Sequence, residues 1–187
     1  TIKDGGDHWI LNGSKMWITN ASKAHQFVVY GTMDPNLKHK GLCAVVVPSD
    51  LEGIVMGKKE EKMGHRSSDT RSIQFENVKV PKENMLGKPG EAWSIAMKTL
   101  DHSRPLVASS AVGGSQRALD CVREYSKQRS QFGVPISKHQ AIQFMIADIA
   151  MKTEASRLLV HKAAWLLDNG ERNTEVASYA KAFAADS

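Results

Sequence analysis

The residue pattern changes near residue 90, and this change constrains the fold more than any other feature of the sequence. Before it, short β-prone runs alternate with turn segments rich in Pro, Asp, Asn and Gly. Several short strands at regular spacing predict a small β-barrel or sandwich. The predicted strands are His8–Asn12, Ser14–Thr19, Gln26–Met33, Gly41–Pro48, Ile54–Lys58 and Arg71–Val80. Between the first two, Asn12–Gly13 predicts a hairpin, because both central residues of a type I′ turn need positive φ.

After Gly90 the pattern becomes helical. The run from Trp93 to Leu100 predicts a short helix, and Pro105 suits the first turn of a long helix that extends to about Arg129. The segment Asp101–Pro105 between them is interpreted as a helix break in which an Asp or Ser side chain acts as a cap. The run FGVPIS ends the first long helix.

A second long helix is predicted from Ser137–Gln140 to about Asp168. Its first four residues form a capping box, in which the Ser caps the helix and the Gln reaches back. Asn169–Gly170 is a typical stop signal. Apolar residues at helical spacing predict the buried stripe of this helix. They are Ile142, Met145, Ile146, Ile149, Leu158, Leu159, Ala163 and Leu166.

A third helix is predicted to start near Asn173 or Thr174. Long helices separated by short breaks favour an antiparallel bundle. The predicted fold is therefore α+β, with a small β-barrel or sandwich domain over residues 1–90 and a helical bundle domain over residues 91–187. The last helix lacks a cap and the first strand has almost no lead-in, so we expect a piece of a longer protein, with both domains truncated.

Composition excludes several classes of protein. The chain is 41% hydrophobic and 24% charged, and no apolar run approaches the roughly 18 residues of a membrane span. The net charge of +5 is spread along the sequence, which suits an anionic small molecule at least as well as a nucleic acid. Cys43 and Cys121 show no pairing pattern and are interpreted as reduced, buried thiols, and the seven histidines lack metal-ligand spacing.

The run NGSKMWITN places a Trp and a Thr on the same predicted face of a strand. Strand alternation puts Met16 and Ile18 on one face, which is interpreted as core, and Lys15, Trp17 and Thr19 on the other. The residues alone leave two interpretations of Trp17 and Thr19, an inter-domain packing pair or a ligand-binding face. The later run RSQFG, followed by His139–Gln140, is consistent with a helix C-terminus that carries a favourable cation, a turn and a helix N-cap.

Five segments of the chain together resemble the acyl-CoA dehydrogenase family. They are GSKMWITN, GHRSSDTRSIQFENVKVPKENMLG, LDHSRPLVA, RSQFGVPISKHQAIQF and RNTEVASYAKAFAADS, in the family's order and approximate spacing. The resemblance covers essentially the whole chain, and it is greatest to the medium-chain member, with the short-chain member next. It implies most of the family's middle β domain, followed by the first part of its C-terminal four-helix bundle.

The resemblance also implies an FAD site. In the family, the strand carrying Trp17, Ile18 and Thr19 lies against the flavin; Thr19 would hydrogen-bond the isoalloxazine near N5, and Trp17 would pack at its dimethylbenzene side. The second segment would hold the adenosine and pyrophosphate end of FAD in a neighbouring subunit. Its implied contacts are Arg129, Gln131, Phe132, His139 and Gln140. A homo-oligomer, with a dimer of dimers as the expected form, follows from this sharing, and the absence of a Gly-rich dinucleotide fingerprint excludes a Rossmann-type site.

The resemblance implies an acyl-CoA site at Asp101, Ser103 and Arg104. Some family members carry the catalytic Glu immediately before this Arg, where this chain has Ser103. Medium- and short-chain members take their base from a Glu on a later loop, which would lie beyond Ser187. No catalytic residue is therefore expected in these 187 residues, and the chain alone is expected to be inactive.

The implied activity is FAD-dependent α,β-dehydrogenation of straight-chain, medium or short acyl-CoA thioesters to trans-2-enoyl-CoA in fatty-acid β-oxidation. Electrons would pass to electron-transfer flavoprotein, in the mitochondrial matrix or a bacterial cytoplasm. Two alternatives stay open, an acyl-CoA oxidase of the same superfamily and a non-catalytic assembly or scaffold relative. A nucleic-acid partner, which one branch of the superfamily has, is disfavoured because the sequence lacks a basic stripe.

Overall fold

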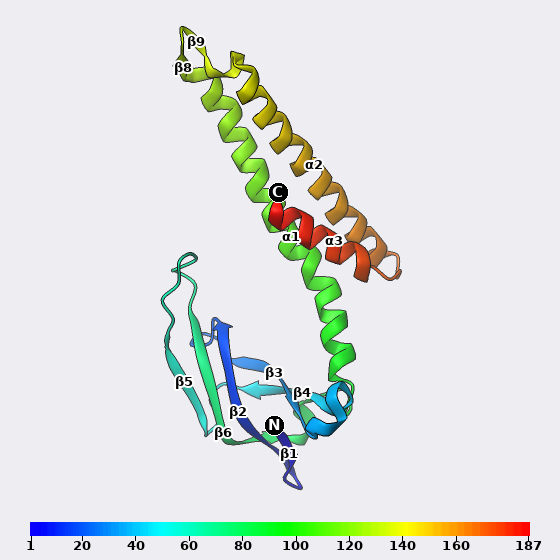
Figure 1. The fold of residues 1–187 in the computed structure, drawn as a ribbon. Helices are drawn as coiled ribbons and strands as arrows, with labels where there is room; N and C mark the ends of the chain where they lie inside the picture. The colour runs from blue at the N-terminus through cyan, green and yellow to red at the C-terminus, as the bar shows by residue number, and fades with distance from the viewer. The chain divides into compact units, whose positions relative to one another are not determined.

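The chain folds into two compact units, residues 1–96 and 97–187, in a computed structural model that describes residues 1–187 (Figure 1). The first unit is β-rich and the second is helical, in agreement with the predicted α+β class. No helix is long and apolar enough to span a bilayer.

The β unit contains two antiparallel sheets. The larger sheet has the strand order β1-β2-β6-β5, formed by β1 (Ile2–Asp4), β2 (His8–Thr19), β6 (Thr70–Pro81) and β5 (Ile54–Lys59). The smaller has the order β3-β4-β7, formed by β3 (Gln26–Thr32), β4 (Leu42–Pro48) and β7 (Met85–Leu86). Two 3-10 helices, η1 (Pro35–Gly41) and η2 (Lys82–Asn84), connect strands. Figure 1 shows β3 and β4 lying across the strands of the larger sheet.

Side chains from the facing surfaces of both sheets form the core of the β unit. Buried apolar residues alternate along the first half of β2, along β3 and along parts of β6, as expected for half-buried antiparallel strands, whereas three consecutive residues of β4 are buried. The large core residues are Ile2, Trp9, Leu11, Phe27, Val29, Val45, Val47, Ile73, Phe75, Val78 and Val80. Cys43 is also buried in this core, as predicted.

The predicted hairpin at Asn12–Gly13 is wrong, because both residues lie inside β2, a single strand of 12 residues. A β-bulge replaces the turn: the register moves from Leu11 opposite Val78 to Gly13 opposite Phe75. Asn77 has a positive φ of 52°. Its side-chain oxygen accepts a hydrogen bond from Asn12 Nδ2 at 3.0 Å, and its main-chain N–H donates to Asn12 Oδ1 at 2.8 Å. Pairing with a strand distant in sequence therefore overrides the local turn signal of Asn12–Gly13.

A second bulge lies at Met16–Trp17, between the pairs Lys15–Ile73 and Ile18–Arg71. Directly opposed residues share a face, so Lys15 and Ile18 lie on the Ile73 side of the sheet. The predicted grouping of Met16 with Ile18 as core is wrong, since Met16 is exposed, whereas Ile18 packs against the core. The cause is the extra residue in β2, which interrupts the alternation of side chains.

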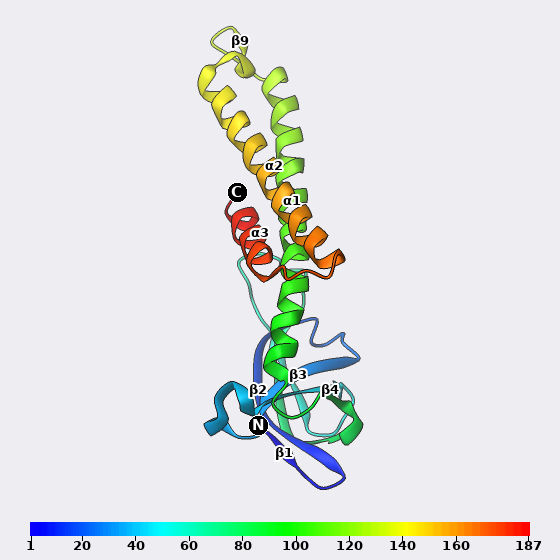
Figure 2. The same ribbon diagram turned by 90° about the vertical axis from the view of Figure 1, so that its right-hand side faces the viewer.

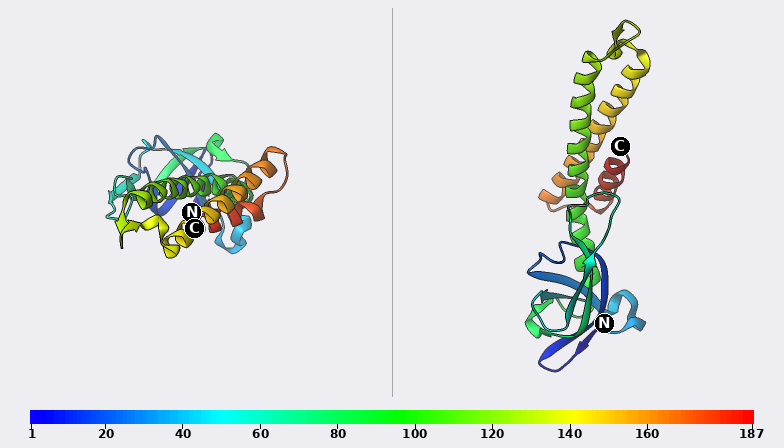
Figure 3. Two further views of the ribbon diagram at one scale, coloured as in Figure 1. Left: turned by 90° about the horizontal axis from the view of Figure 1, so that it is seen from above. Right: turned by 90° about the vertical axis from the view of Figure 1, so that its left-hand side faces the viewer.

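The helical unit consists of two long antiparallel helices and a shorter third one (Figure 2). They are α1 (Ala92–Gln128), whose first turn belongs to the β unit, α2 (Gln140–Asp168) and α3 (Thr174–Asp186). A hairpin of β8 (Ser130–Gln131) and β9 (Val134–Pro135), followed by the 3-10 helix η3 (Ile136–Lys138), joins α1 to α2. The right-hand view of Figure 3 shows this hairpin at the end of the helix pair where α1 ends and α2 begins.

The predicted helix break at Asp101–Pro105 is wrong, because α1 continues through Pro105. A proline inside a helix removes one main-chain hydrogen bond and normally kinks or ends the helix. Here the carbonyl of Asp101, four residues before the proline, accepts a bond from the side chain of Asn173 instead. The interruption that sequence predicts is thus compensated by a residue outside the helix.

The predicted start of α2 is wrong in its capping, and the predicted end of α2 is confirmed. The capping box at Ser137–Gln140 is wrong: His139 occupies the N-cap position without a side-chain cap bond, and the Ser137 carbonyl accepts from Gln143 at 2.9 Å. The predicted stop is confirmed, since Gly170 has φ 71° and donates to Leu167, while Glu171 donates to Leu166. These two bonds define a Schellman motif, which needs a left-handed residue of the kind glycine supplies.

Small residues form the contact between the helices. Ala108 and Val112 of α1 pack with Ala180 and Ala184 of α3, and Leu159 of α2 adjoins this cluster.

The predicted stripe on α2 is wrong at Met145 and Leu158, which are exposed, whereas Thr153, Ser156 and Ala163 are buried. A line of exposed apolar residues follows the opposite side of α2, formed by Phe144, Met151, Leu158 and Trp165. The prediction for Cys121 is also wrong, because this thiol on α1 is exposed.

Candidate functional site

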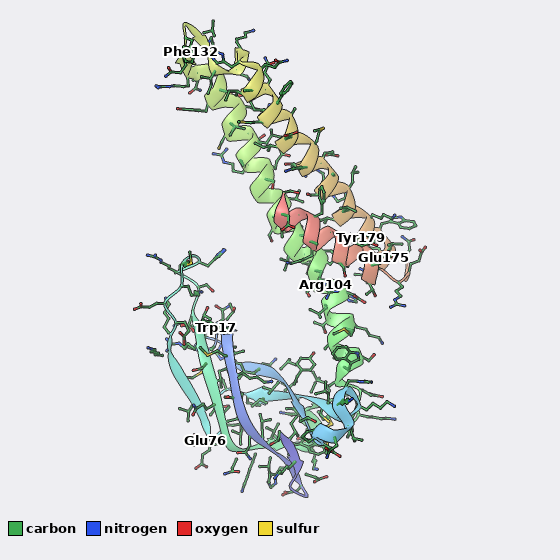
Figure 4. All side chains as sticks on the ribbon, viewed as in Figure 1. Trp17, Glu76, Arg104, Phe132, Glu175 and Tyr179 are labelled. Carbon is green, nitrogen blue, oxygen red and sulfur yellow. The ribbon has the colours of Figure 1, made fainter.

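The first candidate surface lies at the end of β2. Trp17 is 61% exposed, has a positive φ of 61°, and its indole N–H has no hydrogen-bond partner in the chain (Figure 4). A bulky residue with positive φ is a conformational outlier, and such outliers concentrate at functional sites. Thr19 is also exposed and its hydroxyl has no partner. The end of β2 therefore exposes an indole and a free hydroxyl two residues apart.

The end of β2 is fixed by packing and by a hydrogen-bond network around Asp69. Ile18, between the two exposed residues, packs on the core. The Asp69 carboxylate accepts from the Ser22 main-chain N–H at 3.1 Å, the Ser22 hydroxyl at 2.9 Å and Arg71 Nε at 2.9 Å. Its main-chain carbonyl accepts from Asn20 at 2.7 Å. The loop that follows Thr19 is thereby tied to the start of β6.

Replacing Asp69 by Asn is expected to destabilise the β unit at neutral pH. The free energy of unfolding of the variant should also fall less than that of the wild type as the pH is lowered. The bond from the Ser22 main-chain N–H, with smaller contributions from the Ser22 hydroxyl and Arg71, lowers the pKa of Asp69. A lowered folded-state pKa gives stability that is present above the ordinary carboxyl pKa of about 4 and is lost as the pH falls through the folded value. Urea unfolding midpoints measured from pH 7 downward test this.

Asp50→Asn is the matched control, because Asp50 is exposed and its side chain has no partner. Its pH profile should follow that of the wild type. If the unfolding midpoint of Asp69→Asn falls below pH 4 as steeply as that of the wild type, the proposed role of this network is contradicted.

A hollow of about 370 Å³ adjoins the end of β2. Its lining includes Ile18 and Thr19 together with Phe27, Ile73 and Phe75 of the core. Lys15 also lines it, and the Lys15 ammonium donates to the Tyr30 carbonyl at 2.7 Å. Thr19, whose hydroxyl is free, therefore lines a mainly apolar hollow, an arrangement typical of small-molecule sites.

The second candidate surface is the hairpin tip between α1 and α2. Phe132 and Gly133 are the two central turn residues, with φ of 53° and 80°, as a type I′ turn requires. Glycine takes such a φ without strain, whereas phenylalanine does not. Phe132 is 93% exposed, and its ring meets His139 edge-on at 5.9 Å between centroids. The tip thus combines a strained backbone at Phe132 with an aromatic ring exposed to solvent.

The predicted residues of this second surface lie within one short segment. The main-chain N–H of Arg129 donates to the Tyr125 carbonyl, and the Arg129 carbonyl accepts from the Ile136 N–H. The exposed guanidinium of Arg129 has no partner. His139 Nε2 lies 3.2 Å from the Gln131 carbonyl. Gln140, the first residue of α2, is exposed. The structure therefore places an unpaired cation on a fixed main chain beside the strained turn.

The predicted acyl-CoA residues lie on one turn of α1, and two of them contact α3. The Asp101 carboxylate accepts from the Thr174 hydroxyl at 2.7 Å, and Arg104 Nη1 donates to the Ser178 hydroxyl at 3.0 Å. Ser103 is half-buried, and its hydroxyl makes only a long 3.5 Å contact with the Leu100 carbonyl. Sequence reasoning missed Thr174, Ser178 and Asn173; the only available signal was a proline within a helical pattern.

The carboxylates of the chain offer no buried base. Every glutamate is exposed or half-buried, including Glu76 and Glu175, labelled in Figure 4. Three aspartates have a clearly shifted pKa, and in each case hydrogen bonding lowers it. They are Asp4, bonded to Lys82, Asp7, bonded to His8, and Asp69. A lowered pKa makes a carboxylate a weaker base.

Comparison with known proteins gives two family matches. The description "Acyl-CoA dehydrogenase, middle domain" matches residues 1–78, and "Acyl-CoA dehydrogenase, C-terminal domain" matches residues 90–187. The second match alone covers more than half of the chain. Together they account for nearly all of both units.

Individual relatives agree with these matches. The mitochondrial short-chain specific acyl-CoA dehydrogenase of Bos taurus is 46% identical over 186 residues, covering 100% of this chain and 45% of that protein. Butyryl-CoA dehydrogenase from Megasphaera elsdenii superposes with a TM-score of 0.95 at 43% identity, covering 99% of this chain and 49% of that one. A structure described as an FAD-dependent dehydrogenase gives a TM-score of 0.96 at 33% identity, covering 100% and 50%.

The chain spans about half the length of the relatives that it matches. The family matches, the whole-chain identity and the shared fold are nevertheless consistent with one another along the entire sequence. The chain therefore belongs to the acyl-CoA dehydrogenase family.

Proposed function

We propose that the full-length protein is an FAD-dependent dehydrogenase that converts a short, straight-chain acyl-CoA to the trans-2-enoyl-CoA. The observation that carries the proposal is that Trp17, on the bulge of β2, and Thr19, two residues later, are both exposed with unpartnered polar atoms on the strand that the family resemblance places against the flavin. A short acyl chain is favoured over a medium one because two of the relatives are named for short-chain and butyryl substrates.

The residues present fit a flavin dinucleotide. A flat aromatic ring system needs an aromatic neighbour and a few placed polar groups, which Trp17 and Thr19 can supply. Its pyrophosphate needs a cation with bidentate geometry, and the free guanidinium of Arg129 can supply it to the FAD of a neighbouring subunit. When bound, FAD would accept the two reducing equivalents that leave the substrate's α and β carbons.

The chain's own residues would act by binding and orientation. Thr19 would donate its hydroxyl hydrogen bond to the ring edge, and Trp17 would exclude water from one side of it. Ser103 and the Arg104 turn of α1 would border the acyl-CoA. Ser103 cannot remove a carbon-bound proton unaided, because a serine hydroxyl is too weak a base. Its neighbours His102 and Asp101 do not activate it, since they bond the Lys98 carbonyl and the Thr174 hydroxyl. The base would come from a glutamate outside residues 1–187.

The wider setting is part of the same proposal. Electrons would pass to electron-transfer flavoprotein, and a homotetramer would form the shared FAD site. The compartment would be the mitochondrial matrix, as in the bovine relative's name, or a bacterial cytoplasm.

Anaerobic addition of butyryl-CoA to the full-length flavoprotein should bleach the flavin absorbance. Steady-state turnover with electron-transfer flavoprotein should be faster for butyryl-CoA than for octanoyl-CoA, since a pocket built for a short chain excludes extra methylenes. Rapid oxygen consumption would instead indicate the oxidase, faster octanoyl-CoA turnover would indicate the medium-chain type, and no bleaching by any acyl-CoA would indicate a non-catalytic relative.

The 187-residue chain with added FAD is expected to show no dye-coupled turnover of butyryl-CoA or octanoyl-CoA. The physical reason is the lack of a base: Ser103 occupies one family position for it, and the Asp101 carboxylate is bonded to Thr174. The control is free FAD at the same concentration. Turnover above that background would mean that a carboxylate within residues 1–187 acts as the base.

A further inference from the structure

Pro105 leaves one carbonyl of α1 without its helical donor. A proline has no N–H, so the carbonyl four residues earlier, that of Asp101, loses its partner. Asn173 Nδ2 lies 3.0 Å from this carbonyl and 3.2 Å from the carbonyl of Ala163 in α2. The Asn173 side chain is only 3% exposed. One buried amide therefore joins three helices at the point where α1 is interrupted.

The orientation of Asn173 is not explained by its local position. It precedes α3 at the N-cap, where an asparagine side chain commonly accepts from the first helical N–H groups. Asn173 makes no such bond. Its NH₂ group has two hydrogens and faces two carbonyls, which can only accept, so the nitrogen must point toward them. The side chain serves α1 and α2 rather than its own helix.

Two neighbouring bonds hold the same turn of α1. The Thr174 hydroxyl donates to the Asp101 carboxylate at 2.7 Å, and Arg104 donates to the Ser178 hydroxyl at 3.0 Å. The start of α3 thus contacts both ends of the turn Asp101–Arg104, as the position of Arg104 beside α3 in Figure 4 shows. Ser103, between these ends, has no bond to α3.

We propose that Asn173 is a positioning residue, whose amide replaces the main-chain donor that Pro105 lacks and so fixes the turn Asp101–Arg104. The role in catalysis rests on the proposed function, in which this turn borders the acyl-CoA. Without the amide, the Asp101 carbonyl stays unpaired and the helix can kink at Pro105, as helices do at prolines. The side chains of Ser103 and Arg104 would then shift relative to a bound substrate.

A double-mutant cycle in the full-length protein tests the pairing of Asn173 with Pro105. The four proteins are wild type, Asn173→Ala, Pro105→Ala and the double variant, compared by hydrogen–deuterium exchange of the α1 amides that follow Pro105. Asn173→Ala should speed this exchange by about tenfold to a hundredfold, the effect of one unpaired buried carbonyl. In the Pro105→Ala background residue 105 can donate for itself, so Asn173→Ala should change exchange by less than about twofold.

Asn173→Asp is the isosteric control. It keeps the size of the side chain but has only acceptor oxygens, so exchange should be at least as fast as in Asn173→Ala. Wild-type exchange in Asn173→Asp, or an equal effect of Asn173→Ala with and without Pro105, would overturn the proposal. Because this readout needs no substrate, it stands even where the full-length protein does not oxidise acyl-CoA.

Kinetics then test the catalytic part. If butyryl-CoA is turned over, Asn173→Ala should raise KM more than it lowers kcat, since the turn borders substrate and carries no base. Restoring the donor with Pro105→Ala should recover most of the loss. The exchange cycle could show the expected coupling between Asn173 and Pro105 while kcat/KM is unchanged in Asn173→Ala. Asn173 would then only stabilise the helix, and the positioning role would be overturned.

Discussion

Replacing Ile73 by alanine is expected to lower the free energy of unfolding by about 2–5 kcal/mol. Ile73 is 1% exposed and lies on β6 opposite Lys15 of β2 and Met56 of β5. The change removes buried methyl and methylene groups and leaves a cavity beside the hollow at the end of β2. Because β2 pairs with β6 and carries Trp17 and Thr19, β2 cannot move to close the cavity without moving these two residues.

Urea unfolding followed by circular dichroism measures this loss. Gln74→Ala is the matched control, because Gln74 adjoins Ile73 on β6 with its side chain exposed. Its free energy of unfolding should change by no more than about 0.5 kcal/mol. Equal effects of the two substitutions would mean that Ile73 is not part of a close-packed core.

Arg129→Ala in the full-length protein is expected to weaken FAD binding by about 1.5–3 kcal/mol, the value of a hydrogen bond to a charged group. This corresponds to a rise in Kd of about tenfold to a hundredfold. The guanidinium of Arg129 is exposed and unpaired within the chain, so no internal ion pair has to break before it binds phosphate. Equilibrium dialysis of FAD against the apoprotein gives the Kd directly.

Arg117→Ala serves as the charge control, because Arg117 lies on α1 and is, like Arg129, an exposed arginine without a side-chain partner. It should leave the Kd for FAD unchanged. If both substitutions weaken binding equally, Arg129 contributes only general positive potential, and an unchanged Kd in Arg129→Ala would refute its contact with FAD.

Local sequence signals were sufficient wherever the structure depends on neighbours along the chain. The stop at Asn169–Gly170 is one example, because a Schellman motif is built from the last turn of the helix and a left-handed residue just after it. The strands near Gln26–Met33 and Gly41–Pro48 are another, since their apolar, β-branched runs fit a buried sheet in any pairing.

The site was only partly predictable. The family resemblance pointed to Trp17, Thr19 and Arg129, and the structure places all three side chains in solvent without partners. It could not show that Trp17 lies on a bulge, nor that Asp101 and Arg104 bond to α3. The proline in a helical pattern signalled a missing donor at position 105, but not that Asn173 would replace it.

The sequence by itself determined the division into a strand-rich and a helix-rich part, because side-chain periodicity and turn chemistry act over a few residues. Only the tertiary structure decided three points at which a distant residue outweighs a local preference. Asn77, in a bulge of β6, bonds Asn12 and keeps Asn12–Gly13 inside the continuous strand β2, and Asn173 keeps α1 continuous through Pro105. Packing on α3 selects which face of α2 is buried. Each depends on a hydrogen bond or contact between segments far apart in the chain, whose partner no local pattern can identify.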